Sequence, residues 1–400
     1  MMLSFLSRTN GIGGTLKSQP EDFLVEEIRS DGTVLELGKN IEMPDEFGKF
    51  VHFVLEKRNW STTLALKEIA KRVRTSHRNF SFAGSKDRCA ITTQLASGFR
   101  VNKEDLMHLN IRDIKINGAW LAKDKVRLGS LAGNRFTIKL NGADDGAEAK
   151  VKIIHQELDG RFPNYFGEQR FGSSRKNTHL IGEKIIKGDF EAAALDFICR
   201  TEGEENEESI AARKELNATR DFKTALRSFP SNLKLERMMI AHLSDTPSDF
   251  IGAFLRLPRQ LLLLFVHAFQ SHIFNELLSN RIREGEVQME EGEYLCPVSS
   301  FGFPDIDKID LDGWLCMKII GYNSNPNGRE KEILESLEIK KDDFKIKEIP
   351  EISSKGTFRT TFAPLKDFNF SPESSTFRFS LQSGSYATSA LREFITVDKS

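Results

Sequence analysis

The sequence has few cysteines, and they form no recognisable pair. Cys89, Cys199, Cys296 and Cys316 are scattered over 400 residues without a CxxC spacing. That spacing is typical of redox dithiols and zinc sites. We therefore expect reduced, mostly buried thiols and no metal site.

Long apolar runs are also lacking. The longest, residues 261–268, contains a histidine and falls short of the ~20 apolar residues that span a bilayer. Residues 1–10 have no basic residue ahead of their few apolar ones, unlike a secretory signal peptide. These absences favour a cytoplasmic protein without a membrane partner.

A net basic excess is missing as well, because 57 Lys and Arg face 58 Asp and Glu, giving a charge of -1. Nucleic-acid binders usually carry a basic excess. The charge is unevenly distributed along the sequence, however. Between Lys49 and Arg88 there are ten basic and three acidic residues, a local charge of +7. This stretch is either a phosphate-binding surface or a solvated basic face. The ten are residues 49, 57, 58, 67, 71, 72, 74, 78, 86 and 88.

The length favours two domains, and the apolar patterns predict a mixed α and β protein. Residues 60–73 have the spacing of an amphipathic helix, with capping candidates at Ser61, Thr62 and Thr63. Helical spacing dominates the middle of the chain, and strand-like runs dominate both ends. We therefore expect a helical domain inserted between two segments that meet again in space. The expected strands are 50–55, 90–96, 135–140 and 376–381, and the expected central helices are 178–198 and 260–281.

The segment Phe82–Gln94 places Asp87 on a turn between Lys86 and Arg88. Cationic neighbours favour an ionised carboxylate, which can act as a nucleophile or a base. A turn aspartate that only accepts backbone hydrogen bonds is also common. Spacing alone leaves both interpretations open.

The segment Phe162–Gly172 interleaves four aromatic residues with Asn164 and Arg170. Aromatic rings can stack on an unpaired base, and an asparagine can bind a base edge or a ribose. An aromatic-rich turn of the core would have the same composition.

Two further segments, Gly14–Ile28 and Leu381–Phe394, complete a recognisable set. These four segments, in this order, resemble the signature stretches of the TruD family of pseudouridine synthases. Residues 125–136, 177–182 and 268–275 extend the resemblance over almost the whole chain.

The resemblance implies specific roles for residues of these segments. The catalytic aspartate of the family falls on Asp87, in the sequence Gly84-Ser-Lys-Asp. Tyr386 stands at a position where Phe also occurs in the family. The implied uridine-contacting residues are Phe23, Asn164 and Tyr386, and further active-site positions are Lys17, Phe166 and Arg170.

The resemblance also implies an α+β fold with two domains. Residues 1–177 and 357–400 would form a catalytic domain with a mixed, largely antiparallel sheet, and residues 178–356 an inserted α/β TRUD domain. Basic residues 49–88, with Arg161, Arg170, Arg175 and Lys176, would hold RNA phosphates.

The implied activity is the isomerisation of a uridine in tRNA, commonly uridine 13 of the D arm, by a monomer that needs no cofactor and does not act on DNA. Two alternatives remain open. One is a non-catalytic RNA-binding or RNA-folding protein with the same fold. The other is a glycosidic hydrolase, which would release free uracil.

Overall fold

The computed structural model describes residues 3–144, 146–172 and 174–399 and has an α+β fold, as predicted. The chain divides into two compact units. The first, here called the sheet unit, comprises Phe5–Asn164, Pro297–Asp305 and Phe362–Ser400. The second, the helical unit, comprises residues 3–4, Tyr165–Cys296 and Ile306–Thr361.

The sheet unit is built on an eight-stranded sheet of order β14-β15-β7-β2-β5-β3-β6, with β4 paired to β5. Strands β2 and β5 run parallel and the other recorded pairs are antiparallel, which confirms a mixed, largely antiparallel sheet. The strands of this unit are β1 (Gly13–Thr15), β2 (Phe23–Arg29), β3 (Phe50–Arg58), β4 (Phe80–Phe82), β5 (Ile91–Phe99), β6 (Ile114–Ala122), β7 (Leu131–Lys139), β8 (Asn141–Ala143), β9 (Arg161–Pro163), β13 (Phe362–Pro364), β14 (Lys366–Ser371) and β15 (Thr376–Gln382).

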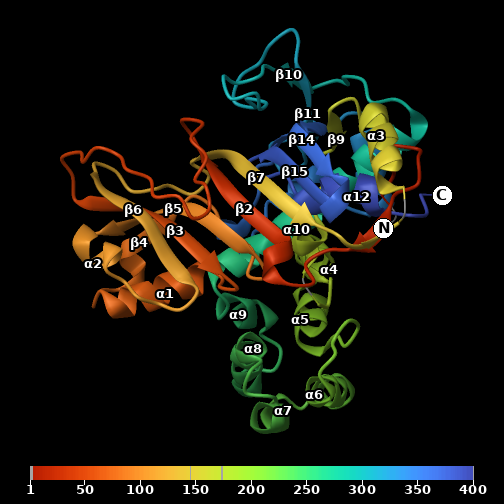
Figure 1. Ribbon diagram of the computed structural model, residues 1–400. Helices are drawn as coiled ribbons and strands as arrows, with labels where there is room; N and C mark the ends of the chain where they lie inside the picture. The colour runs from red at the N-terminus through yellow and green to blue at the C-terminus, as the bar shows by residue number, and fades with distance from the viewer. Residues whose placement is uncertain (1–2, 145, 173, 400) are drawn as a thin grey trace. The chain divides into compact units, whose positions relative to one another are not determined.

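Segments from the beginning, middle and end of the chain lie side by side in this sheet. Figure 1 shows β2 in red, β7 in yellow and β15 in blue as neighbours, and their backbones pair in that order. The Ile12 amide also donates to the Phe394 carbonyl at 2.8 Å. Both chain ends therefore build one sheet unit, as an inserted-domain layout requires.

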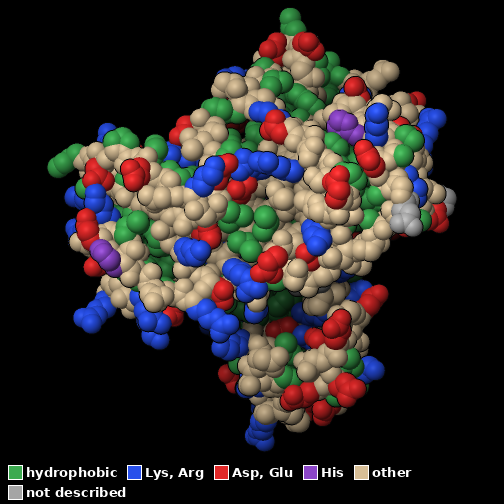
Figure 2. Space-filling view, viewed as in Figure 1, with side chains coloured by type: hydrophobic (Ala, Val, Ile, Leu, Met, Phe, Trp, Pro, Cys, Tyr) green, Lys and Arg blue, Asp and Glu red, His purple; other side chains and the backbone are tan. Residues whose placement is uncertain are grey.

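Three α-helices pack around this sheet, namely α1 (Thr62–Arg72), α3 (Ala147–Leu158) and α12 (Ala387–Ile395), while α2 (Lys103–Met107) lies beside β6. Helix α1 confirms the expected amphipathic helix. The Ser61 side chain accepts from the Leu64 amide at 3.3 Å and so caps its first turn. Leu66 and Ile69 are buried, whereas the basic side chains of α1 are exposed; Figure 2 shows them gathered along this edge of the unit.

The helical unit contains most of the remaining helices and one small sheet of order β10-β11-β12. Its core is formed largely by helices α4, α5 and α8–α10. The elements are α4 (Thr178–Ile186), α5 (Phe190–Cys199), α6 (Glu207–Thr219), α7 (Phe222–Ser228), α8 (Lys234–Asp245), α9 (Phe250–Leu255), α10 (Arg259–Glu284), α11 (Gly328–Ser336), β10 (Tyr294–Cys296), β11 (Trp314–Ile319) and β12 (Thr357–Thr360). Short 3-10 helices occur at Pro20–Asp22, His77–Asn79, Glu168–Phe171, Lys341–Phe344, Pro350–Ile352 and Pro372–Ser374.

One expected helix, residues 178–198, is wrong as a single element. It is broken between α4 and α5, where Gly188 adopts φ +77° and the Asp189 side chain caps α5 by accepting from the Ala192 amide at 2.9 Å. A glycine after the last turn of a helix, followed by an aspartate, is the usual signature of such a break.

Helix α10, which contains the expected helix 260–281, is long and apolar enough to cross a membrane by length and composition. However, 67% of its most apolar window is buried inside the protein. The core helix of a soluble protein shows this combination of length and burial.

Candidate active site

Asp87 lies in the loop between β4 and β5 of the sheet unit and is paired with Lys17. The Lys17 ammonium donates to the Asp87 carboxylate at 2.5 Å, and both side chains are partly exposed. Lys17 has φ +60°, a left-handed conformation that non-glycine residues rarely adopt. The two side chains therefore form an ion pair that is open to solvent on one side.

A buried polar network fixes the loop that carries Asp87. The Lys86 ammonium donates to the Glu27 carboxylate at 2.6 Å, and the other oxygen of that carboxylate accepts from the Leu95 amide at 3.0 Å. The Lys86 amide donates to the Thr62 hydroxyl at 3.0 Å, and the Gln94 side chain donates to the Gly84 carbonyl at 3.0 Å. The backbone on either side of Ser85 is therefore held by interior partners.

Lys57 contacts the same loop from the interior of the protein. It is 1% exposed, and its ammonium donates to the backbone carbonyl of Asp87 at 2.8 Å. Burial lowers the pKa of Lys57 to about 8, against the attraction of Asp87, which opposes this change, while repulsion by Lys86 adds to it. The Asp87 backbone thus rests on a cation that is expensive to bury.

Phe23 stands close to the Lys17–Asp87 pair, at the first position of β2. The Lys17 ammonium lies 4.2 Å from the centre of its ring. The ring is only 2% exposed and meets Phe136 edge-on at 6.1 Å. In this structure Phe23 is therefore a core residue with one face toward the lysine.

Asn164 and the segment before Tyr386 form a second contact within the sheet unit. The Ser385 hydroxyl donates to the Asn164 side-chain oxygen at 2.9 Å, and Asn164 is fully buried. Tyr386 is half-buried and stands at the first position before α12, where its carbonyl accepts from the amides of Ser389 and Ala390.

The Asp87 loop and the Tyr386 segment border the same end of β7. The Gly129 amide donates to the Ala83 carbonyl at 2.7 Å, and the Ser383 amide donates to the Ala132 carbonyl at 3.0 Å. The start of β7 therefore connects the two groups of predicted site residues in this unit.

Phe166 and Arg170 belong to the helical unit, where Phe166 is enclosed by cations and another ring. The Arg359 guanidinium lies 4.1 Å and that of Arg170 5.7 Å from the centre of the Phe166 ring. Phe274 meets the ring edge-on at 5.6 Å. Asn275 fixes the Phe166 backbone, since its side chain accepts from the Phe166 amide at 2.8 Å and donates to the Phe166 carbonyl at 2.9 Å.

Three residues of the expected phosphate-binding surface are wrongly assigned to it. Lys57 and Lys86 are buried and engaged with Asp87 and Glu27. The Arg175 guanidinium donates to the Phe197 carbonyl at 2.6 Å and to the Glu236 carboxylate at 3.1 Å, and burial lowers its pKa. The charged groups of these three residues bind partners inside the protein. In contrast, the side chains of Lys67, Lys71, Arg72 and Arg74 are exposed.

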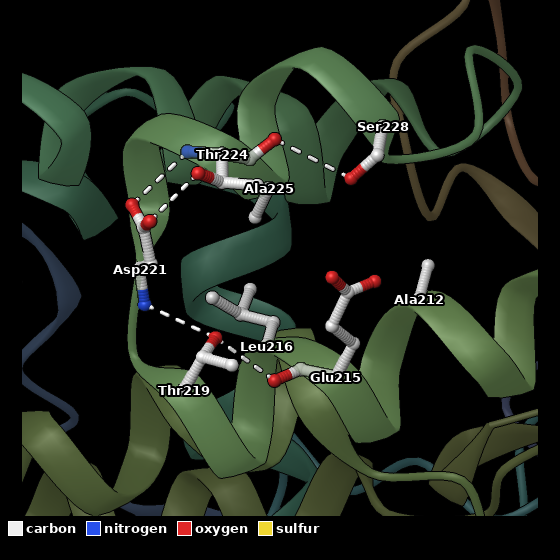
Figure 3. A pocket seen from close by; sticks show the side chains of 8 residues that line it. All are labelled: Ala212, Glu215, Leu216, Thr219, Asp221, Thr224, Ala225 and Ser228. Carbon is white, nitrogen blue, oxygen red and sulfur yellow. Dashed lines mark hydrogen bonds between the residues drawn. The ribbon is translucent and has the colours of Figure 1, made fainter.

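The cavity drawn in Figure 3 is too small to be the site. It lies between α6 and α7 of the helical unit and has a volume of about 70 Å³, below the roughly 300 Å³ of a typical ligand pocket. Asp221 at its wall is already engaged, as it accepts from the Thr224 amide at 3.0 Å. Over the described part of the chain, no cluster of three His, Cys, Asp or Glu side chains could hold a metal ion.

The family model described as tRNA pseudouridine synthase D (TruD) matches residues 1–394. The chain belongs to the TruD family. Its members are isomerases, so the chain is assigned to the tRNA pseudouridine synthases. The expected family, fold class and enzyme class are confirmed.

Other TruD proteins match over nearly their whole length. A protein named "Probable tRNA pseudouridine synthase D" from Methanococcus maripaludis strain C5 is 40% identical over 393 residues, which cover 95% of each chain. One of the same name from Methanosarcina acetivorans is 34% identical over 430 residues, covering 98% of this chain and 95% of its own. A TruD crystal structure from Methanosarcina mazei superposes with a TM-score of 0.77 at 34% identity, covering 99% of this chain and 96% of that one.

The sequence interpretation missed several residues that support the TruD site. Glu27 could have been found, because an apolar strand with two successive glutamates must turn one of them inward. Asn275 lies at the end of a segment that resembles the family. Lys57 and Arg359 carry no local signal, since their partners are 30 or more residues away in the sequence.

Proposed function

We propose that this TruD protein converts a uridine of tRNA, uridine 13 of the D arm, to pseudouridine, with Asp87 as the nucleophile. The observation that carries the proposal is the Lys17–Asp87 pair, held at 2.5 Å on a loop whose backbone is fixed by buried partners. A charged carboxylate in a rigid, partly exposed position is suited to attack a sugar carbon.

Pseudouridine formation breaks the bond from the uracil nitrogen to the ribose, turns the base, and rejoins it through carbon 5. A carboxylate can support this reaction by attacking the anomeric carbon, as in retaining glycosidases, or by removing a proton toward a glycal-like intermediate. Both routes begin at the Asp87 carboxylate and require no redox cofactor. Lys17 would be the charge partner of that carboxylate until the sugar arrives.

The uridine must leave its stack before a carboxylate can reach its sugar. We assign Phe23, Asn164 and Tyr386 of the sheet unit to holding the detached base, the asparagine through hydrogen bonds and the rings through stacking. For Phe23 this requires Lys17 to move off the ring face that it covers in this structure. The Tyr386 hydroxyl leaves its ring available for this role. In the helical unit, Phe166 would provide a further stacking ring and Arg170 a phosphate contact.

The domain roles follow the same proposal. Residues 1–177 and 357–400 would be the catalytic domain and residues 178–356 the inserted TRUD domain. We expect the enzyme to act as a cytoplasmic monomer on tRNA, with the exposed basic residues of α1 contacting phosphates.

The test compares the wild type with Asp87→Asn on a pool of unmodified tRNA. Pseudouridine is mapped at nucleotide resolution, while free uracil and RNA binding are measured in parallel. Asp87→Asn keeps the shape of the side chain but removes its charge, so we expect loss of pseudouridine with RNA binding retained.

Each outcome has a defined meaning. Pseudouridine at a position other than 13 would overturn the target assignment alone. Free uracil without pseudouridine would indicate a hydrolase. Full activity of Asp87→Asn would refute the nucleophile, and no pseudouridine from the wild type would refute the substrate.

A further inference from the structure

The connection between β6 and β7, residues 123–130, presents an apolar side chain among cations. Leu128 is 83% exposed. Lys123, Lys125 and Arg127 on the same connection are exposed as well. Asp124 is the one acidic residue of this connection, so Leu128 stands on a segment with a local charge of +2 that attracts phosphates.

The connection holds Leu128 rigidly. Val126, two residues earlier, is 5% exposed and packs in a core cluster, and its amide donates to the Ser97 hydroxyl at 2.9 Å. After Leu128, the turn is closed by the Ser130 amide and hydroxyl, which donate to the Arg127 carbonyl at 3.1 and 2.6 Å. Exposure here is therefore not a sign of a loose loop.

The same connection is joined directly to the loop of Asp87. The amide of Gly129, the residue after Leu128, donates to the Ala83 carbonyl at 2.7 Å, and Ala83 shares a core cluster with Val126. Gly84, the next residue, begins the fixed segment that ends at Asp87. A displacement of one loop would move the other.

Three other apolar residues are similarly exposed but stand beside acidic residues. Phe47, 102% exposed, directly follows Asp45 and Glu46 in the sheet unit. Ile309 and Leu311, 77% and 97% exposed, belong to the helical unit and alternate with Asp310 and Asp312. Those carboxylates repel an RNA backbone. Leu128 combines exposure, cationic neighbours and attachment to the Asp87 loop.

We propose that Leu128 inserts into the RNA base stack and takes the place that the target uridine leaves, while Lys125 and Arg127 hold the adjacent phosphates. Proteins that kink or open nucleic acids insert leucine and similar side chains between bases in this way. The inference rests on the proposed function, because it assumes that a uridine is taken out of its stack. Leu128 is a positioning residue, since it acts on the stack and not on the reacting atoms.

The test uses the full chain with Leu128→Ala, the conservative Leu128→Met, and Leu311→Ala as a matched control. Single-turnover rates of pseudouridine formation are measured on a tRNA transcript. Unstacking is measured by the fluorescence of 2-aminopurine placed next to the target uridine, with each change introduced into Asp87→Asn so that no reaction occurs. Thermal unfolding shows that each variant is folded.

We expect Leu128→Ala to lower the single-turnover rate about tenfold or more, because unstacking loses the side chain that fills the gap. The fluorescence rise on binding should shrink in parallel, with RNA affinity changed less than the rate. Leu128→Met should restore both, and Leu311→Ala should match the wild type.

The inference is overturned if Leu128→Ala keeps the rate, or if it keeps the fluorescence rise. It is also overturned if Asp87→Asn alone gives no rise. Absence of pseudouridine from the wild type would instead refute the proposed function, so the two failures are distinguishable.

Discussion

At the scale of single residues, Lys57 makes stability depend on pH. Its pKa is about 8 in the folded chain and 10.5 when exposed. Between these values the unfolded chain binds more protons, so the contribution of Lys57 to the free energy of unfolding rises with pH across this window, by about 2 to 3 kcal/mol. Below pH 8 both states hold the proton and the contribution is constant.

The measurement is urea unfolding of the wild type and Lys57→Met at pH 7 and pH 10. The difference in free energy of unfolding, wild type minus variant, should increase at the higher pH, because methionine does not titrate. A difference that is equal at both values would contradict the burial of a charged Lys57.

A second residue-scale prediction concerns Asn275, which holds both backbone groups of Phe166. Asn275→Ala removes both bonds at a fully buried position, which should lower the free energy of unfolding by about 2 to 4 kcal/mol. Denaturant unfolding measures this loss. The control is Asn280→Ala on the same helix, where the side chain is half-buried and accepts from the Arg283 guanidinium at 2.6 Å. If the two variants are equally stable, the hydrogen bonds of Asn275 contribute little.

At the scale of elements, helices α4 and α10 approach closely at Gly182. A Cβ atom added there would lie 2.0 Å from the Phe265 carbonyl oxygen, so the helices must move apart to accept any side chain. Gly182→Ala should therefore cost about 3 kcal/mol or more, despite the better helix propensity of alanine.

The matched control is Gly328→Ala at the start of α11, where no atom lies within 4 Å of the added carbon. Thermal unfolding should show a lowered midpoint for Gly182→Ala and an unchanged or raised one for Gly328→Ala. Equal midpoints would mean that the packing of α4 on α10 adapts without cost.

The helices and strands also show which sequence signals are sufficient to predict an element. Helix α1 was predictable because one face supplies its core contacts and Ser61 caps it locally. The strands β3, β5, β7 and β15 were recognisable from their own residues, but their order in the sheet was not. Some of its pairings join distant segments, such as β7 with β15, whose partners Gly133 and Gln382 are 249 residues apart. Gly188 followed by Asp189 is a local signal for the break between α4 and α5, although helical spacing continues on both sides of it.

The candidate site shows the same difference between local and long-range signals. Asp87, Phe23 and Lys17 were proposed as site residues by family resemblance, since the local sequence of Asp87 is also that of an ordinary turn. Counting charges could not separate Lys67, which is exposed, from Lys86, which is buried against Glu27, 59 positions away. Long-range pairing decides which cations remain available for RNA.

At the scale of the whole molecule, the near-zero net charge hides an uneven surface. Figure 2 shows basic side chains over α1 and acidic side chains over α6. Lys67→Ala with Lys71→Ala should weaken tRNA binding and reduce the slope of log K against log salt by up to about 2, or about 1 for each phosphate that is no longer neutralised.

Binding is measured between 50 and 200 mM salt, a range over which phosphate binding changes affinity by orders of magnitude. The control removes two exposed lysines from the acidic side, with Lys214→Ala and Lys223→Ala, and should leave the slope unchanged. An equal effect of both double variants would mean that only total charge matters.

Two neighbouring strands of the sheet are synthesised far apart in time. β15 pairs with β7, yet 236 residues, 140–375, are translated between them, a delay of roughly 10 to 50 s at ribosomal rates. Through that interval one edge of β7 has no partner, and an unpaired edge is open to pairing with other chains. Residues 165–296 and 306–361 of the helical unit are synthesised within that interval, so β7 gains its second partner strand only after almost the whole helical unit has been made.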